Sequence, residues 1–282
     1  MALSGLYPLR ARIESKTMTI QILLIAFAAL LTFTAAVLTS RAARCNAGWR
    51  AWICYRVAMI YNFLRPRCTA TNACTYPEHG PAIIVANHTS PADPLLLWIR
   101  HFSQFRKPRL RVIGYMMAKE YYTRGGLLTW ICKAMECIPV ERNGQDMAPI
   151  KEALRRLQAG HLLGLFPEGG INIESPNERL RAGEVGVAWL ALRSKAPVIP
   201  VFISDAPRSE SMVRVFFKRA RSRLTYGHPV DLSPWHNDKP SHTDLIEATD
   251  KIMQSIASLG GLQITPSFTR TTRQAKDGPK QE

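Results

Sequence analysis

Beyond residue 82 the chain alternates short apolar runs with longer amphipathic stretches, and this alternation restricts the possible folds more than any other feature. Short apolar runs bounded by turn residues indicate buried strands, and the stretches between them have helical length. Such alternation is typical of an α/β domain with a largely parallel central sheet. We expect strands at residues 82–86, 110–116, 137–141, 162–167 and 198–203, with 213–217 and 224–226 making the edge mixed. Flanking helices are expected near residues 91–101, 120–133, 145–159, 184–194 and 241–259.

The N-terminal part of the chain has a different character. No charged residue lies between Lys16 and Arg41, and this segment is long enough to cross a hydrocarbon core of roughly 30 Å. It therefore predicts a membrane helix that acts as an anchor. A cleaved signal peptide is the alternative, because basic residues precede the segment, but its apolar stretch exceeds an ordinary signal-peptide core. A slight excess of arginines after the segment favours the cytoplasmic face for the main domain.

Aromatic residues and arginines alternate in the segment that follows, from residue 47 to residue 64. This composition suits an interfacial helix in the headgroup region, although a core helix packed on the main domain would look similar. We expect an anchor and interfacial helix over residues 1–66 and one catalytic-sized domain over residues 67–260. A disordered tail is expected over residues 261–282, where few apolar groups remain.

The charge balance indicates an anionic partner. There are 37 basic and 21 acidic residues, for a formal net charge of +16. A phospholipid surface, a phosphorylated substrate or nucleic acid would each fit such a chain. Nucleic acid is the weakest of the three, because no groove-reading motif is present and the basic residues are spread. The six cysteines form no C-x-x-C pair and have no histidine at zinc-finger spacing, so we expect reduced, structural thiols and no bound metal.

A polar motif, N-H-T-S-P-A-D-P, follows the first expected strand directly at residues 87–94. His88 and Asp93 cannot touch in a regular strand or helix, where positions five apart point in different directions. A sharp turn from strand into helix would bring them together, with Ser90 as N-cap and Pro91 at the first helical position. The alternative is structural: S-x-x-D is also a capping box, and His88 could be a loop residue.

Two further motifs follow strand-like runs. F-P-E-G-G at residues 166–170 would make a tight turn that holds Glu168 and Gly169 at the edge where α/β folds bind ligands. I-P-V-E-R places Arg142 just after another expected strand. As alternatives, Glu168 would be an ordinary turn residue and Arg142 an exposed surface charge.

Taken in order, His-x4-Asp, I-P-V-E-R, F-P-E-G and the P-V-I-P-V run at residues 197–201 resemble the four blocks of the glycerolipid acyltransferase family, best known as lysophosphatidic acid acyltransferases. The resemblance covers roughly residues 82–203 and implies the family's glycerol-3-phosphate acyltransferase-like α/β fold. It implies His88 as general base and Asp93 as its orienting carboxylate. Arg142 would bind the acceptor's phosphate, Glu168 and Gly169 its glycerol region, and Arg181 is a second candidate for the phosphate.

The resemblance also implies the partners. The donor would be acyl-CoA or acyl-carrier protein acting as co-substrate, with no cofactor, and the acceptor a lysophospholipid, foremost 1-acylglycerol 3-phosphate. The chain departs from the family pattern where A-M-E-C precedes Ile138 and where Gly170 follows F-P-E-G, so another lysolipid or an aminolipid stays open as acceptor. A catalytically silent phospholipid-binding protein is the alternative from another class. Basic residues at 208–223 would hold anionic lipid or coenzyme A phosphates, or be solvated.

Overall fold

The computed structural model describes residues 6–64, 68–103, 110–141, 147–172, 179–209, 214–218, 220–237 and 239–262. The chain divides into two compact units, residues 1–52 and residues 53–282. The division lies inside helix α2 (Gly48–Leu64), whereas the sequence analysis places it after residue 66. The expected disordered tail lies outside the described residues from residue 263 onward, and so does Arg142.

The first unit is dominated by one long helix, α1 (Leu6–Ala43). Residues 18–43 of this helix are long and apolar enough to cross a membrane, and none of the residues in their most apolar window is buried. No other helix in the described part of the chain meets these criteria. A helix whose apolar side chains point in all directions is poorly suited to water, because it has no polar face to present.

The second unit is built on a seven-stranded sheet with the strand order β1-β7-β6-β2-β5-β3-β4. Its strands are β1 (Thr69–Ala70), β2 (Ala82–Ala86), β3 (Ile113–Ala118), β4 (Ile138–Val140), β5 (Leu162–Leu165), β6 (Val198–Ser204) and β7 (Arg223–Tyr226). The strands from β6 to β4 are mutually parallel, β7 runs antiparallel to β6, and β1 runs parallel to β7. The expectation of a mostly parallel sheet with a mixed edge is confirmed.

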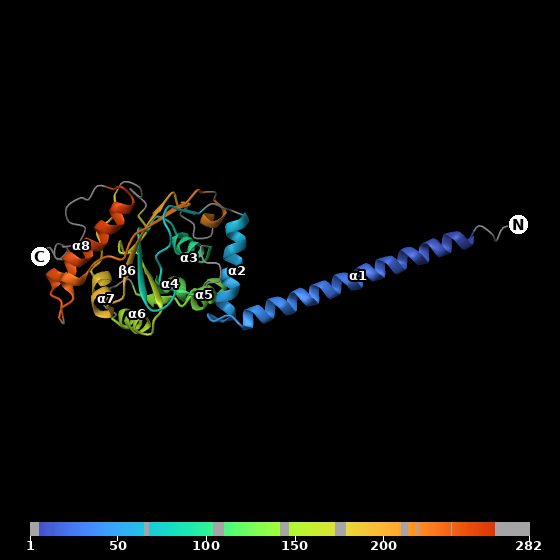
Figure 1. Ribbon diagram of the computed structural model, residues 1–282, viewed down its shortest axis with the longest axis horizontal. Coiled ribbons are helices and arrows are strands. Elements are labelled where there is room, and N and C mark those ends of the chain that lie inside the picture. The colour runs from blue at the N-terminus through green and yellow to red at the C-terminus, as the bar shows by residue number, and fades with distance from the viewer. Residues whose placement is uncertain are drawn as a thin grey trace, which may run out of the picture. The chain divides into compact units, whose positions relative to one another are not determined.

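Helices cover both faces of the sheet. Figure 1 shows α6 (Ala148–Gln158), α7 (Gly186–Ser194) and α8 (His242–Leu259) together on one side, with α3 (Asp93–Ser103) on the other. A cluster of buried apolar side chains joins the first three helices to β2, β5 and β6. On the other face, Leu97 and Trp98 of α3 are almost fully buried. Because both faces are covered, β2 reads as an unbroken apolar run, as parallel strands do.

Strand β3 begins three residues later than expected, and Arg111 supplies the reason. Its guanidinium group donates hydrogen bonds to the backbone carbonyls of Pro77, Gly80 and Gly160. This anchoring keeps residues 110–112 outside the ladder at the edge where the parallel strands begin. A half-buried guanidinium with three carbonyl acceptors is well satisfied, and its burial lowers the pKa of Arg111.

The helix expected at 120–133 is broken in two. Helix α4 (Lys119–Tyr122) and helix α5 (Gly126–Ala134) are separated by residues 123–125, and Gly125 and Gly126 at the break both have positive φ. The Thr129 hydroxyl spans the break, because it donates to the Tyr122 carbonyl and accepts from the Gly125 N–H. Two glycines in the left-handed region are compatible with a turn and not with a continuous helix.

The prediction of a strand at residues 213–217 is wrong. Residues Arg214–Phe217 form a short 3-10 helix, η1, which buries Val215 and leaves Phe217 65% exposed. In a strand, Val215 and Phe217 would lie on the same face, whereas a helix with three residues per turn points them in different directions. A second 3-10 turn, η2 (Ser233–Trp235), precedes α8, whose start is set by a capping box between Ser241 and Asp244.

Candidate active site

The carboxyl ends of β2, β5 and β6 meet at one edge of the sheet, and the polar motifs follow them directly. The parallel register pairs Val85 of β2 with Leu165 of β5 and with Pro200 of β6. His88 therefore lies two residues beyond the end of one strand and Glu168 three residues beyond the end of its neighbour. This edge is where open α/β sheets bind ligands.

His88 and Asp93 are in contact, as the sequence predicts. Nδ1 of His88 lies 3.0 Å from Oδ2 of Asp93, whose side chain is fully buried, while the imidazole is 16% exposed. Because an ionised carboxylate only accepts hydrogen bonds, Nδ1 carries the proton and Nε2 keeps its lone pair. The arrangement is that of a general base held in one tautomer.

The same oxygen of Asp93 also closes the turn. The backbone N–H groups of Thr89 and Ser90 donate to Oδ2 at 2.7 Å and 2.8 Å. Helix α3 starts at Asp93, two residues later than expected. The carboxylate of Asp93 therefore both closes the turn that leads into the helix and contacts the histidine. Among the described residues, Oδ1 of Asp93 is buried without a hydrogen-bond partner. The hydrogen bonds that hold the turn and the histidine therefore all converge on Oδ2.

Ser90 is fully buried, and its hydroxyl is turned away from the histidine. It donates to the carbonyl of Pro207, in the loop after β6, and accepts from the backbone N–H of Ala92. A serine nucleophile would have to hydrogen-bond to the base. Ser90 therefore supports the loop, and the geometry does not pair it with His88 for covalent catalysis.

The imidazole of His88 is stacked on the ring of Phe166. The ring centroids are 4.0 Å apart and the planes differ by 16°. Phe166 in turn lies parallel to Tyr115, with centroids 5.8 Å apart. Gly164 makes room for this layer, because a Cβ at that position would collide with the Tyr115 ring. The stack on Phe166 fixes the plane of the imidazole ring, and the contact with Asp93 fixes the direction in which Nδ1 points within that plane.

Glu168 is buried, and both of its carboxylate oxygens accept hydrogen bonds from the protein. The backbone N–H of His88 donates to Oε1 at 2.9 Å, and the backbone N–H of Arg181 donates to Oε2 at 2.8 Å. Burial raises the pKa of the Glu168 carboxyl, and these donors oppose that shift. Glu168 thus joins the histidine loop to the segment near residue 181.

Two buried asparagines complete the support of the histidine loop, and no sequence signal singled them out. The backbone N–H of Asn172 donates to the His88 carbonyl at 2.7 Å, and its side-chain amide donates to Glu168 at 3.3 Å. Asn87 forms two side-chain hydrogen bonds with the backbone of Ile203, at 2.7 Å and 2.9 Å. These bonds hold the end of β2 against β6 where the ladder has stopped.

The remaining expected site residues surround this turn. Gly169 has φ of +70° and donates its N–H to the Phe166 carbonyl, which closes the F-P-E-G turn. The side chain of Arg181 is exposed, and Nη1 lies 3.7 Å from the place where a Cβ on Gly170 would be. Its guanidinium group is thus beside the F-P-E-G-G turn. In the described part of the chain, no group of three or more His, Cys, Asp or Glu could hold a metal ion.

Comparison with known proteins agrees with the motif order and the fold. A family model described as "Acyltransferase" matches residues 67–204. A 1-acyl-sn-glycerol-3-phosphate acyltransferase from Bacillus subtilis is 27% identical over 206 residues, covering 73% of this chain and 94% of that protein. Residues 67–204 carry the acyltransferase domain, and the relatives support the glycerolipid acyltransferase family. An N-acylphosphatidylethanolamine synthase from Arabidopsis thaliana is 28% identical over 151 residues, or 52% of this chain and 51% of the relative.

A solved structure shares the fold. The crystal structure of a 1-acyl-sn-glycerophosphate acyltransferase from Thermotoga maritima matches with a TM-score of 0.59 at 15% identity, covering 81% of this chain and 88% of that one. The acyltransferase described here therefore has the α/β architecture that its motifs predict.

Proposed function

We propose that this acyltransferase transfers a fatty acyl group from acyl-CoA or acyl-carrier protein to the free hydroxyl of a lysophospholipid, foremost 1-acyl-sn-glycerol 3-phosphate. The observation that carries the proposal is the contact of His88 Nδ1 with the buried Asp93 carboxylate, which leaves Nε2 available as a base. The Bacillus subtilis relative supports the choice of acceptor.

The chemistry needs no acyl-enzyme. Nε2 of His88 takes the proton of the acceptor hydroxyl while its oxygen attacks the thioester carbon, and Asp93 stabilises the resulting imidazolium. The C–S bond then breaks, and the imidazolium returns the proton to the departing thiolate. A thioester is already activated, so the proposed reaction requires neither a protein nucleophile nor a cofactor. The buried Ser90 hydroxyl, which is directed at Pro207, fits direct attack.

Acceptor binding is assigned to the residues that the motifs single out. Arg142 and Arg181 would hold the phosphate, since a guanidinium group binds phosphate oxygens in a planar, bidentate way. Glu168 and Gly169 would line the glycerol region. The protein donors on Glu168 indicate that its main contribution is to position His88, with one lone pair of Oε1 still available to a hydroxyl.

We further propose that the protein is bound to a membrane by α1 as a single span, with the second unit at the cytoplasmic face. The span of residues 18–43 supports the anchor, and lysophospholipids are found in membranes. An aminolipid acceptor is the second candidate, because a relative named N-acylphosphatidylethanolamine synthase aligns with half of the chain.

The acceptor is tested by incubating detergent-solubilised protein with labelled oleoyl-CoA, or oleoyl-carrier protein, and a panel of lysophospholipids and phosphatidylethanolamine. Diacyl product from lysophosphatidic acid that is absent with His88→Ala is the expected result. His88-dependent product from another lipid only would replace the acceptor and keep the reaction. The absence of any His88-dependent product with either donor would refute the proposal in favour of a silent lipid-binding protein.

A further inference from the structure

Helix α2 exposes apolar side chains on one face within the second unit. Four residues, spread over about 120° of the helix circumference, are between 56% and 83% exposed: Val57, Ile60, Phe63 and Leu64. The opposite face is packed on the domain, where Ala58 is buried and Tyr55 contacts Trp98 of α3 edge-to-face. Exposed apolar side chains gathered on one helix face indicate a surface that is covered in the working protein.

The 3-10 helix η1 lies beside this face. Phe216 of η1 contacts Tyr61 of α2 edge-to-face, with ring centroids 6.1 Å apart. Tyr61 flanks the exposed face of α2, so η1 extends that face sideways. The next residue, Phe217, is 65% exposed although Val215 in the same turn is fully buried. Two elements that are distant in sequence thus present aromatic and aliphatic groups side by side.

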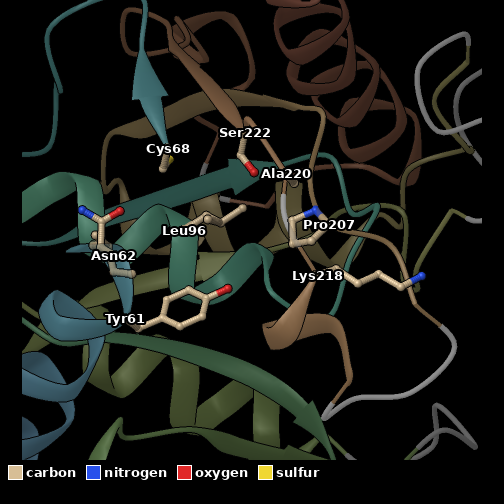
Figure 2. Close-up of a pocket in the computed structure, with 9 residues that line it drawn as sticks. Tyr61, Asn62, Cys68, Leu96, Pro207, Lys218, Ala220 and Ser222 are labelled. Atoms are coloured by element: carbon tan, nitrogen blue, oxygen red, sulfur yellow. The ribbon is translucent and has the colours of Figure 1, made fainter. Parts of the chain in front are cut away.

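Basic residues accompany the apolar ones. Residues 208–223 contain six basic residues and one acidic residue, and the Lys218 side chain next to Phe217 is exposed. Lys218 and Tyr61 both line a small, open surface cleft, whose apolar wall includes Leu96 of α3. Figure 2 shows the Lys218 side chain extending away from this cleft, with its ammonium group outward. Apolar groups flanked by outward-facing ammonium groups match an anionic bilayer surface.

We propose that η1 is a second membrane contact of this protein. Phe217 and Lys218 of this segment, beside the exposed face of α2, would bind the second unit to an anionic lipid leaflet. The inference rests on the membrane association put forward under Proposed function and adds the surface and the lipid charge. The charge complementarity selects anionic lipid as the occupant, because a second copy of this strongly basic chain would bring like charges together. The docked surface would place the mouth of the cleft at the headgroup level.

Hydrogen–deuterium exchange of the full chain tests this without requiring any acyl transfer. The protein is placed in detergent, in phosphatidylcholine nanodiscs and in nanodiscs that also contain phosphatidylglycerol. We expect the peptides that cover α2 to be protected in both nanodiscs. The peptides that cover η1 should be protected only with phosphatidylglycerol, since each near-surface basic residue contributes about fivefold to lipid binding.

The double variant Phe217→Ser, Lys218→Glu should lose the protection of η1 and keep that of α2. Arg193→Glu is the matched control, because Arg193 is an exposed basic residue at the end of α7, which packs on α6 and α8, and its exchange pattern should equal the wild type. Equal exchange of η1 in all three environments, or protection that the double variant retains, would overturn the proposal. If protection of η1 in detergent grows with protein concentration, the surface is covered by a second copy of the chain and the lipid proposal is overturned. Loss of acyl transfer alone would leave the proposal standing.

Discussion

A single oxygen, Oδ2 of Asp93, closes the turn after β2 and orients His88. It accepts hydrogen bonds from two backbone N–H groups and faces His88 Nδ1, so the same residue that starts α3 also sets the tautomer of His88. The structural and the functional interpretation of S-x-x-D are therefore compatible. This explains why a short motif can carry both tasks: the turn that brings His88 and Asp93 together is the turn that their own contacts stabilise.

Glu168 gives a prediction for the pH dependence of stability. Burial raises its folded-state pKa above the ordinary value of about 4.3, so between the two values the folded state binds more protons than the unfolded state. Stability must then fall as pH rises through that window. Glu168→Gln cannot titrate at this position, so the unfolding free energy of wild type minus that of the variant should decrease from pH 4 to pH 7.5. Urea unfolding in detergent at both pH values measures it; a difference that rises with pH would contradict the account.

The residue-level contacts divide into those that sequence could predict and those that it could not. His88, Asp93 and Glu168 were predictable, because each follows a recognisable strand in a motif. Asn87 and Asn172 were not, since their partners lie up to 116 residues away in sequence and depend on how strands are paired. Phe166 reads as an ordinary turn residue until its stack with His88 is seen.

The strands that carry the site were predictable as elements because buried parallel strands are short apolar runs. Their boundaries shifted where long-range contacts decide, as at Arg111. The segment 213–217 was misassigned because five residues contain too few repeats to separate a period of two from a period of three. The pairing of β1 with β7 joins segments about 150 residues apart, which local patterning does not encode.

The stacked layer of β3 and β5 gives a prediction about packing. Gly164→Ala would drive a Cβ into the Tyr115 ring. Movement of Tyr115 away from the clash would displace Phe166, on which the His88 imidazole is stacked. We expect a loss of about 1–3 kcal/mol in unfolding free energy together with a lower kcat. Gly186→Ala is the matched control, because a Cβ there meets nothing within 4 Å at the start of α7. Denaturant unfolding and initial rates test both variants; equal behaviour of the two would contradict the packing argument.

Considered as a whole molecule, the protein combines a long apolar helix with a basic α/β unit. If α1 spans the bilayer, wild-type protein should stay in the membrane fraction after alkaline carbonate washing. Leu24→Arg combined with Leu31→Arg should release it, because each charge near the bilayer centre costs about 2.5–3.5 kcal/mol. Leu24→Phe combined with Leu31→Phe should behave as wild type. Carbonate extraction of the wild-type protein itself would show that the contact is peripheral.

The most direct test of the account compares two histidines in the same protein. His161 also lies 3.0 Å from a carboxylate, that of Glu136, but both side chains are exposed and His161 precedes β5, whereas the site follows it. We predict that His88→Ala lowers kcat for acyl transfer by roughly 10²–10⁴ and that His161→Ala leaves it unchanged, with both variants folded by circular dichroism. Acyl transfer by His88→Ala at the wild-type rate would contradict the central claim that His88 is the general base.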